Sequence, residues 1–340
     1  MRRRHLIAIA AALAGAALFA YAVRRAGVGD IVEAVRRVGW GLVPILVLAG
    51  FRFLIRAQCW RWCLPAGTAF PLRRAVAAFL AGDAVGNVTP LGLLASEPTK
   101  VLLTRHHLAT RESVASLAVE NLVYASSVMA MVGIGLVVLA ANVAMPAAWR
   151  IVTGAVLVAM VGGGAVALRA MRGTWDDSRG ARPRWRERLA TVRDEAVRLS
   201  GGHPERLWRV FALDLGFHAL AVFEVFVTLQ WLLGDRSPTL FQAIVFEALN
   251  RVITVVFKFV PFRVGIDEAS AGALAPILSV NPAAGVALAV VRKVRNLVWA
   301  AVGLVLVAVH PAEGSAATKG HEDDLATKHT KNRLVDHKDL

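Results

Sequence analysis

Apolar residues in this chain come in long blocks, and the charged residues fall mostly between the blocks. A run of about 18 or more apolar residues is typical of a helix that crosses a membrane. The pattern therefore predicts an all-α, polytopic membrane helix bundle. We expect about six full spans, over residues 5–23, 41–58, 114–141, 149–169, 208–233 and 286–309.

Two further apolar stretches, 75–97 and 241–279, are interrupted by polar residues and helix breakers. The interrupting residues include Asp83, Asn87 and Pro90 in the first stretch, and Asn250, Arg251, Lys258, Pro261, Asp267 and Glu268 in the second. Irregular backbone at membrane depth is tolerated only where it is buried in protein or lines a wet cavity. We therefore predict two broken helical hairpins, which bring the count to seven or eight segments by hydropathy.

Lysine and arginine set the expected orientation, because they concentrate in cytoplasmic loops. The 171–207 loop is the most basic and is placed in the cytoplasm, whereas the 142–148 loop carries no charge and is placed outside. The connection 24–37 holds four arginines and argues the other way. With the N-terminus inside, the stretch 75–97 enters from the cytoplasm and 241–279 from outside. Both are then re-entrant, with opposite polarity.

The two broken stretches also resemble each other. Pro90-Leu-Gly-Leu-Leu-Ala-Ser-Glu97 matches Pro261-Phe-Arg-Val-Gly-Ile-Asp-Glu268, since both run from a proline over six residues to a glutamate. Glu-Asn-Leu-Val-Tyr-Ala at 120–125 then matches Arg-Asn-Leu-Val-Trp-Ala at 295–300. The alternative is chance similarity between apolar helices. A true repeat of opposite orientation is the plan of many secondary transporters, whose broken helices form the substrate site near the midplane.

Composition limits the classes of partner and site that we expect for this chain. The 340 residues are 56% hydrophobic and carry a net charge of +15, which suits basic cytoplasmic loops and anionic lipid surfaces. We expect no nucleic-acid partner, because no basic module with interleaved aromatic residues is present. Cys59 and Cys63 are too few for a metal site or a disulfide framework. Residues 1–310 are expected to form one transmembrane domain and residues 311–340 a disordered polar tail.

The first apolar segment follows Arg2-Arg3-Arg4 and ends near Ala20-Tyr21-Ala22, which imitates a secretory signal and its cleavage site. Because the apolar run is longer than a usual signal, we expect an uncleaved first helix.

Charged residues inside apolar segments are the candidates for chemistry, because each charge costs about 2.5–3.5 kcal/mol at the centre of a membrane helix. We expect Glu97 or Glu120 to pair with Arg292 or Arg295, either as a structural staple or as the lining of a cavity for a lipid head group or a proton. The full set of candidate cavity residues is Asn87, Pro90, Glu97, Lys100, Glu120, Asn121, Asn250, Lys258, Pro261, Glu268, Arg292, Arg295 and Asn296.

The sequence lacks the motifs of common cofactor and catalytic sites. It contains no G-x-x-x-x-G-K-[ST] run, no dinucleotide fingerprint, no H-E-x-x-H and no visible nucleophile–base pair. We therefore expect no cofactor, no metal and no enzymatic activity.

The motifs resemble a known family. Asn87-Val-Thr-Pro90, Ser96-Glu97-Pro98-Thr99-Lys100 and Glu120-Asn121-Leu122 in the first half are similar to the lysylphosphatidylglycerol synthase transmembrane, or flippase-like, family. In the second half Asn250-Arg251, Phe259-Val260-Pro261 and Gly265-Ile266-Asp267-Glu268 agree. Ser96 stands where a glycine is usual in the family.

The resemblance covers about residues 5–309 and implies movement of a lipid, or of a lipid-linked head group, between leaflets of the plasma membrane. Hopanoid-associated relatives look similar, so the lipid is expected to be an anionic phospholipid or an isoprenoid or hopanoid lipid. The soluble aminoacyl-transferase domain of the larger synthases has no counterpart in the sequence given. The alternative function is a membrane scaffold that recruits a separate lipid-modifying transferase through its basic loop.

Overall fold

The computed structural model describes residues 28–65, 67–89, 92–144, 146–171, 205–234, 236–258 and 260–309. Every regular element within these ranges is helical, so the predicted all-α class is confirmed. The α-helices are α2 (Val28–Val38), α3 (Leu42–Trp62), α4 (Leu72–Val88), α5 (Gly92–Thr104), α6 (Thr110–Asn142), α7 (Ala147–Met171), α9 (Glu205–Leu233), α10 (Leu240–Val256), α11 (Ile266–Leu274) and α12 (Pro282–Val309). Short 3-10 turns are η1 (Gly39–Gly41), η2 (Pro261–Arg263) and η3 (Ala275–Leu278).

Long apolar helices form the frame of the bundle. The stretches Arg36–Trp62, Thr110–Asn142, Ala147–Ala165 and Glu205–Leu233 are long and apolar enough to cross a membrane. They coincide with four of the six predicted spans. The expected span 5–23 lies outside the described residues. The remaining one, 286–309, lies within α12, whose 28 residues give a length of about 42 Å.

The outer surface of the bundle suits lipid better than water. Helix α7 packs along α6 and turns large apolar side chains outward, with Ile151 71% and Val158 73% exposed. Contiguous apolar surface of this kind is rare on soluble monomers. The chain is therefore a multi-pass protein embedded in a membrane.

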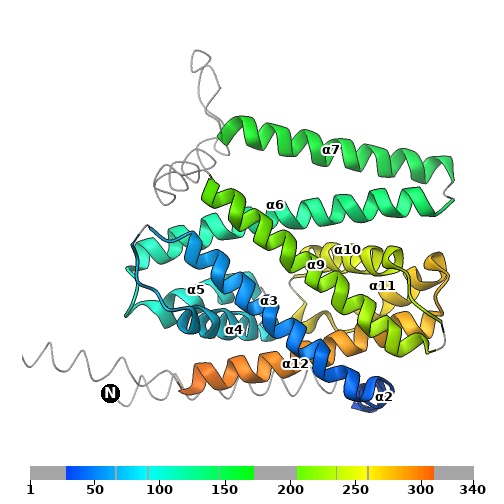
Figure 1. Ribbon diagram of the computed structural model, residues 1–340, viewed down its shortest axis with the longest axis horizontal. Helices are drawn as coiled ribbons and strands as arrows, with labels where there is room; N and C mark the ends of the chain where they lie inside the picture. The colour runs from blue at the N-terminus through cyan, green and yellow to red at the C-terminus, as the bar shows by residue number, and fades with distance from the viewer. Residues whose placement is uncertain are drawn as a thin grey trace, which may run out of the picture.

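The two interrupted stretches form two helical hairpins that occupy opposite halves of the bundle (Figure 1). The first hairpin, α4 and α5, has its free ends at the end of the bundle where α6 begins. The second hairpin, α10 and α11, has its free ends at the other end, where α12 begins. Helices α3 and α9 cross between the halves and pack on each other.

Each hairpin is held by the long helix of the other half, and each contact depends on a glycine. Helix α12 packs on α4, and a Cβ at Gly303 would lie 2.2 Å from the carbonyl oxygen of Leu80. Helix α6 packs on α10, and a Cβ at Gly135 would lie 2.1 Å from the Cβ of Ala248. No larger residue fits at either glycine unless the backbones move apart.

The inner tips of the two hairpins meet in the interior. Phe262 of η2 is 4% exposed and packs in one apolar cluster with Ala84 and Val88 of α4. Phe262 and Arg263 have φ values of +49° and +48°, a left-handed conformation that costs about 1–3 kcal/mol at a residue with a side chain. The turn between α10 and α11 is thus strained at the point where it reaches the other hairpin.

Candidate functional site

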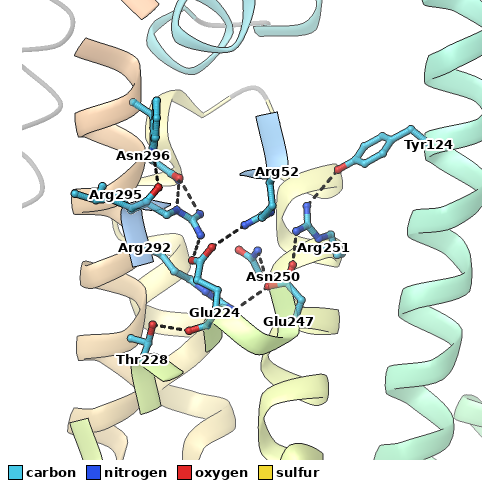
Figure 2. Close-up of polar contacts among 12 residues, drawn as sticks. Arg52, Tyr124, Glu224, Thr228, Glu247, Asn250, Arg251, Arg292, Arg295 and Asn296 are labelled. Carbon is cyan, nitrogen blue, oxygen red and sulfur yellow. Dashed lines mark hydrogen bonds and ion pairs between the residues drawn. The ribbon is translucent and has the colours of Figure 1, made fainter. Parts of the chain in front are cut away.

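Six charged side chains, five of them buried and Arg52 partly buried, form an ionic network between the two halves, drawn in Figure 2. Four helices supply them, and we call the set the central network. Its members are Arg52 of α3, Glu224 of α9, Glu247 and Arg251 of α10, and Arg292 and Arg295 of α12.

Each carboxylate of the central network contacts two guanidinium groups. Glu224 pairs with Arg295 and, at 3.1 Å, with Nη1 of Arg52. Glu247 pairs with Arg251 and, at 3.0 Å, with Nη2 of Arg292. Both carboxylates are almost fully buried, at 1% and 2% exposure, so these contacts replace their hydration.

The central network carries more positive than negative charge. Four guanidinium groups face two carboxylates, which leaves an excess of two positive charges when all six groups are ionised. In addition, Nε of Arg52 and Nε of Arg251 are buried without a hydrogen-bond partner. A buried cationic excess with free donors is the electrostatic complement of an anion.

A second buried cluster adjoins the first along α3. Arg56, one helical turn from Arg52, pairs with Glu120 of α6 at 2.7 Å and lies 3.6 Å from Asp214 of α9. We call these three residues the Arg56 cluster. Tyr124 connects the two clusters, because the guanidinium of Arg56 lies 3.6 Å from the centre of its ring and Arg251 donates to its hydroxyl at 3.2 Å.

An apolar cavity of about 620 Å³ opens between α6, α9 and α10. Its walls include Met131, Val222, Phe226 and Ile244. At its polar end lies His218, which is 2% exposed and interacts electrostatically with charges of both clusters.

The rim of the cavity reaches the outer surface of the bundle. Ile134 is 48%, Phe223 53% and Leu240 60% exposed. The cavity thus runs from the lipid-facing side of the bundle to a histidine beside the buried charges.

Comparison with known proteins decides the family. A family model described as lysylphosphatidylglycerol synthase TM region matches residues 6–303. The chain belongs to this family. No curated protein and no solved structure matches it. Membership relates the chain to lipid modification or flippase function, and it agrees with the resemblance seen in the motifs.

Four of the candidates chosen from the sequence lie at the central network of this family member. Arg292 and Arg295 belong to it, Asn296 accepts from Arg295 at 2.8 Å, and Asn250 lies 3.4 Å from Glu247. Asn250 and Arg292 also line a small recess, which has room for about one water molecule. The polar cavity expected at the midplane stays a prediction.

Other candidates lie elsewhere, in the hairpins and on α6. Glu97 pairs with Lys100 at 2.8 Å within α5, and Glu268 of α11 pairs with Lys293 of α12. Asn87 hydrogen-bonds the carboxylate of Asp83 at 2.9 Å. Asn121 is partly buried on α6, Lys258 is exposed after α10, and Pro261 begins η2. Pro90 lies outside the described residues.

The expected pairing of Glu97 or Glu120 with Arg292 or Arg295 is wrong. Glu97 is satisfied by Lys100 of its own helix and Glu120 by Arg56 of α3. The two arginines of α12 reach carboxylates of α9 and α10 instead, because α12 crosses the half of the bundle that contains Glu224 and Glu247.

The candidate set chosen from the sequence omitted six residues of the two clusters. They are Arg52, Arg56, Asp214, Glu224, Glu247 and Arg251. A signal was available, since all six are charged residues within apolar stretches. An intramembrane charge is a candidate for function by default.

Proposed function

We propose that this chain moves a lipid with an anionic, phosphate-bearing head group between the leaflets of the plasma membrane. The role is transport, with no chemical change in the lipid. The observation that carries the proposal is that His218 lines the apolar cavity and stacks on Tyr124, to whose hydroxyl Arg251 of the central network donates.

The cavity suits the tail of the lipid. Nine of its ten lining residues are apolar, and its half-exposed rim would let a chain enter sideways from the bilayer. Covering apolar walls with a hydrocarbon chain contributes about 25 cal/mol for each Å² removed from water. A soluble ligand would gain nothing from a rim that faces lipid.

The central network suits the head group. Guanidinium groups bind phosphate with two parallel hydrogen bonds, and Arg52 and Arg251 each keep a buried Nε–H without a partner. An anion also offsets the excess of positive charge, which is costly in an apolar bundle. A cationic or uncharged head group would leave that excess in place.

The arrangement of helices supports alternating access. We propose that α3–α6 and α9–α12 are inverted repeats and that α4–α5 and α10–α11 are re-entrant hairpins. The matched contacts of α12 with α4 and of α6 with α10 support this, as does the meeting of the hairpin tips at Phe262. Rocking of the two halves would then expose the central network to each leaflet in turn.

The test fills the cavity while leaving the charges alone. Val222→Trp places a bulky ring in the cavity wall, where Val222 is 8% exposed. Its matched control, Val161→Trp, alters a side chain of α7 that is 72% exposed. Each variant is reconstituted in vesicles that contain a fluorescent phosphatidylglycerol analogue, and its transfer to the outer leaflet is followed by quenching.

We expect Val222→Trp to slow transfer by about tenfold, which is equivalent to about 1.4 kcal/mol in the barrier, and Val161→Trp to leave it unchanged. Gel filtration and melting temperature verify that both variants fold. Transfer at the wild-type rate in a folded Val222→Trp variant would exclude the cavity as the lipid path.

A further inference from the structure

We propose that Asp214 is a proton-binding site, that His218 relays the proton along α9, and that proton binding is coupled to occupancy of the central network by an anion. Only the coupling rests on the proposed function. The proton site itself follows from the geometry of the Arg56 cluster.

The two carboxylates of the Arg56 cluster are not equivalent. Glu120 contacts both terminal nitrogens of Arg56, at 2.7 Å to Nη1 and 3.1 Å to Nη2. Asp214 reaches the same guanidinium only at 3.6 Å, through Oδ1, and that oxygen also accepts from the Cys59 thiol at 3.5 Å. Arg56 and Glu120 thus neutralise each other, and the charge of Asp214 is left over.

The second oxygen of Asp214 has no partner. Asp214 is 0% exposed, and its Oδ2 is buried without a hydrogen bond. A buried carboxylate with a spare charge and a free oxygen is stabilised most simply by a proton on that oxygen. The Arg56 cluster is then neutral, as an apolar surrounding demands.

His218 lies one turn further along α9, on the same face as Asp214. Its Nδ1 is also buried without a partner, and its Nε2 lies 3.1 Å from the hydroxyl of Ser127. His218 ends at the apolar cavity. Two successive groups with free, buried proton-binding atoms therefore connect the Arg56 cluster to the proposed lipid path.

The charged and titratable groups around this pair come from three other helices. They are Arg52, Arg56, Cys59 and Cys63 of α3, Glu120 and Tyr124 of α6, and Glu247 and Arg251 of α10. Arg56 and Cys59 contact Asp214 directly, and Glu120 pairs with the same Arg56.

The sign of the coupling follows from the charges. Arg52 and Arg251 of the central network act on His218, so an empty network disfavours a proton on its imidazole. An anion at the network removes that repulsion, so that the pair of Asp214 and His218 takes up a proton more readily. By reciprocity a proton on this pair strengthens anion binding. Proton and anion are thus expected to bind and leave together.

The step involves no change other than proton transfer. A proton from water at one membrane face forms an O–H bond at Oδ2 of Asp214. That bond breaks when the proton passes to Nδ1 of His218, and the proton then leaves together with the anionic head group.

Infrared difference spectroscopy of the purified full chain, between acidic and alkaline pH, tests the proton site without any lipid. We expect a carboxylic acid band at the high frequency of a carboxyl group without hydrogen bonds, distinct from the band of solvated carboxyl groups. Asp214→Asn should remove this high-frequency band, and Asp214→Glu should shift it. Asp267→Asn is the matched control and should keep the high-frequency band, because Asp267 is paired one-to-one with Arg263 at 3.1 Å. No high-frequency band in the wild type, or one that survives in Asp214→Asn, would overturn the site.

Transfer of the phosphatidylglycerol analogue across a pH gradient tests the coupling. One proton per lipid shifts the distribution between leaflets by up to about tenfold per pH unit, and Asp214→Asn should abolish the shift. If transfer by the wild type does not change with a pH gradient of either direction, the coupling is refuted but the proposed function is not. A chain that moves no lipid overturns the proposed function and the coupling with it, while the infrared result still decides the site.

Discussion

Replacing Glu247 with glutamine should destabilise the protein far more than removing either of its arginine partners. Glu247 is 2% exposed and is the carboxylate shared by Arg251 and Arg292. Its loss leaves two buried guanidinium groups without a carboxylate partner. Breaking a buried ion pair in this way costs about 3–5 kcal/mol.

Arg251→Gln removes one ion pair and the hydrogen bond to the Tyr124 hydroxyl, but it leaves Glu247 paired with Arg292, so no buried charge loses its last partner. The expected cost is about 1.5–3 kcal/mol. Glu33→Gln is the control for the change of residue type, because Glu33 pairs with Arg37 at 2.6 Å on the surface, where such pairs contribute about 0–1 kcal/mol.

Equilibrium unfolding by dodecyl sulfate in mixed micelles, followed by tryptophan fluorescence, gives the free energy of each variant. The expected order of destabilisation is Glu247→Gln, then Arg251→Gln, then Glu33→Gln. Adding Arg292→Gln to Glu247→Gln should recover part of the loss, since one stranded charge is removed. Exposed ion pairs contribute at most about 1 kcal/mol. If the unfolding free energies of Glu247→Gln and Glu33→Gln differ by no more than this, the central network is not a buried ionic site.

Two further predictions test the arrangement of the hairpins. Gly303→Ala should lower the free energy of unfolding by about 1–3 kcal/mol, because the new Cβ meets α4. The control Gly162→Ala on α7 has open space and should raise it by up to about 1 kcal/mol. Equal unfolding free energies of the two variants would contradict the close packing of α12 on α4. The second prediction concerns labelling of intact cells with an impermeant maleimide. Cysteines placed at Ser237 and Ala283, which are both exposed beside the second hairpin, should react from outside, whereas a cysteine placed at His107 should react only after permeabilisation. The native Cys59 and Cys63 are buried and should give little background. Reaction of all three from the same side would refute opposed hairpins.

The bundle itself follows from hydropathy, whereas the ion pairs do not. The apolar runs at 114–141 and 208–233 locate α6 and α9 to within a few residues, because burial in lipid demands uninterrupted apolar length. The same reasoning found the two hairpins, because Asn87 and Pro261 would be costly in plain lipid-facing helices.

Partners of buried charges depend on which helices cross, and hydropathy contains no such information. Arg295 was recognised as an intramembrane charge, but its partner Glu224 lies 71 residues away on a helix that was read as a plain span. The apolar cavity could not be predicted from the sequence for a related reason. Val222 and Ile244 read as ordinary core or lipid-facing residues, and only the distance between α6, α9 and α10 leaves a void beside them.

The two-to-one ratio of guanidinium groups to carboxylates bears on how such a bundle can move at all. If every intramembrane carboxylate had a single partner, sliding one helix would separate full charges in a medium of low permittivity and the barrier would be prohibitive. Here Glu224 can release Arg52 while Arg295 stays, and Glu247 can release one arginine while the other stays. Because the second arginine stays in contact while the first one leaves, the proposed rocking of the two halves would never leave a buried carboxylate without a partner.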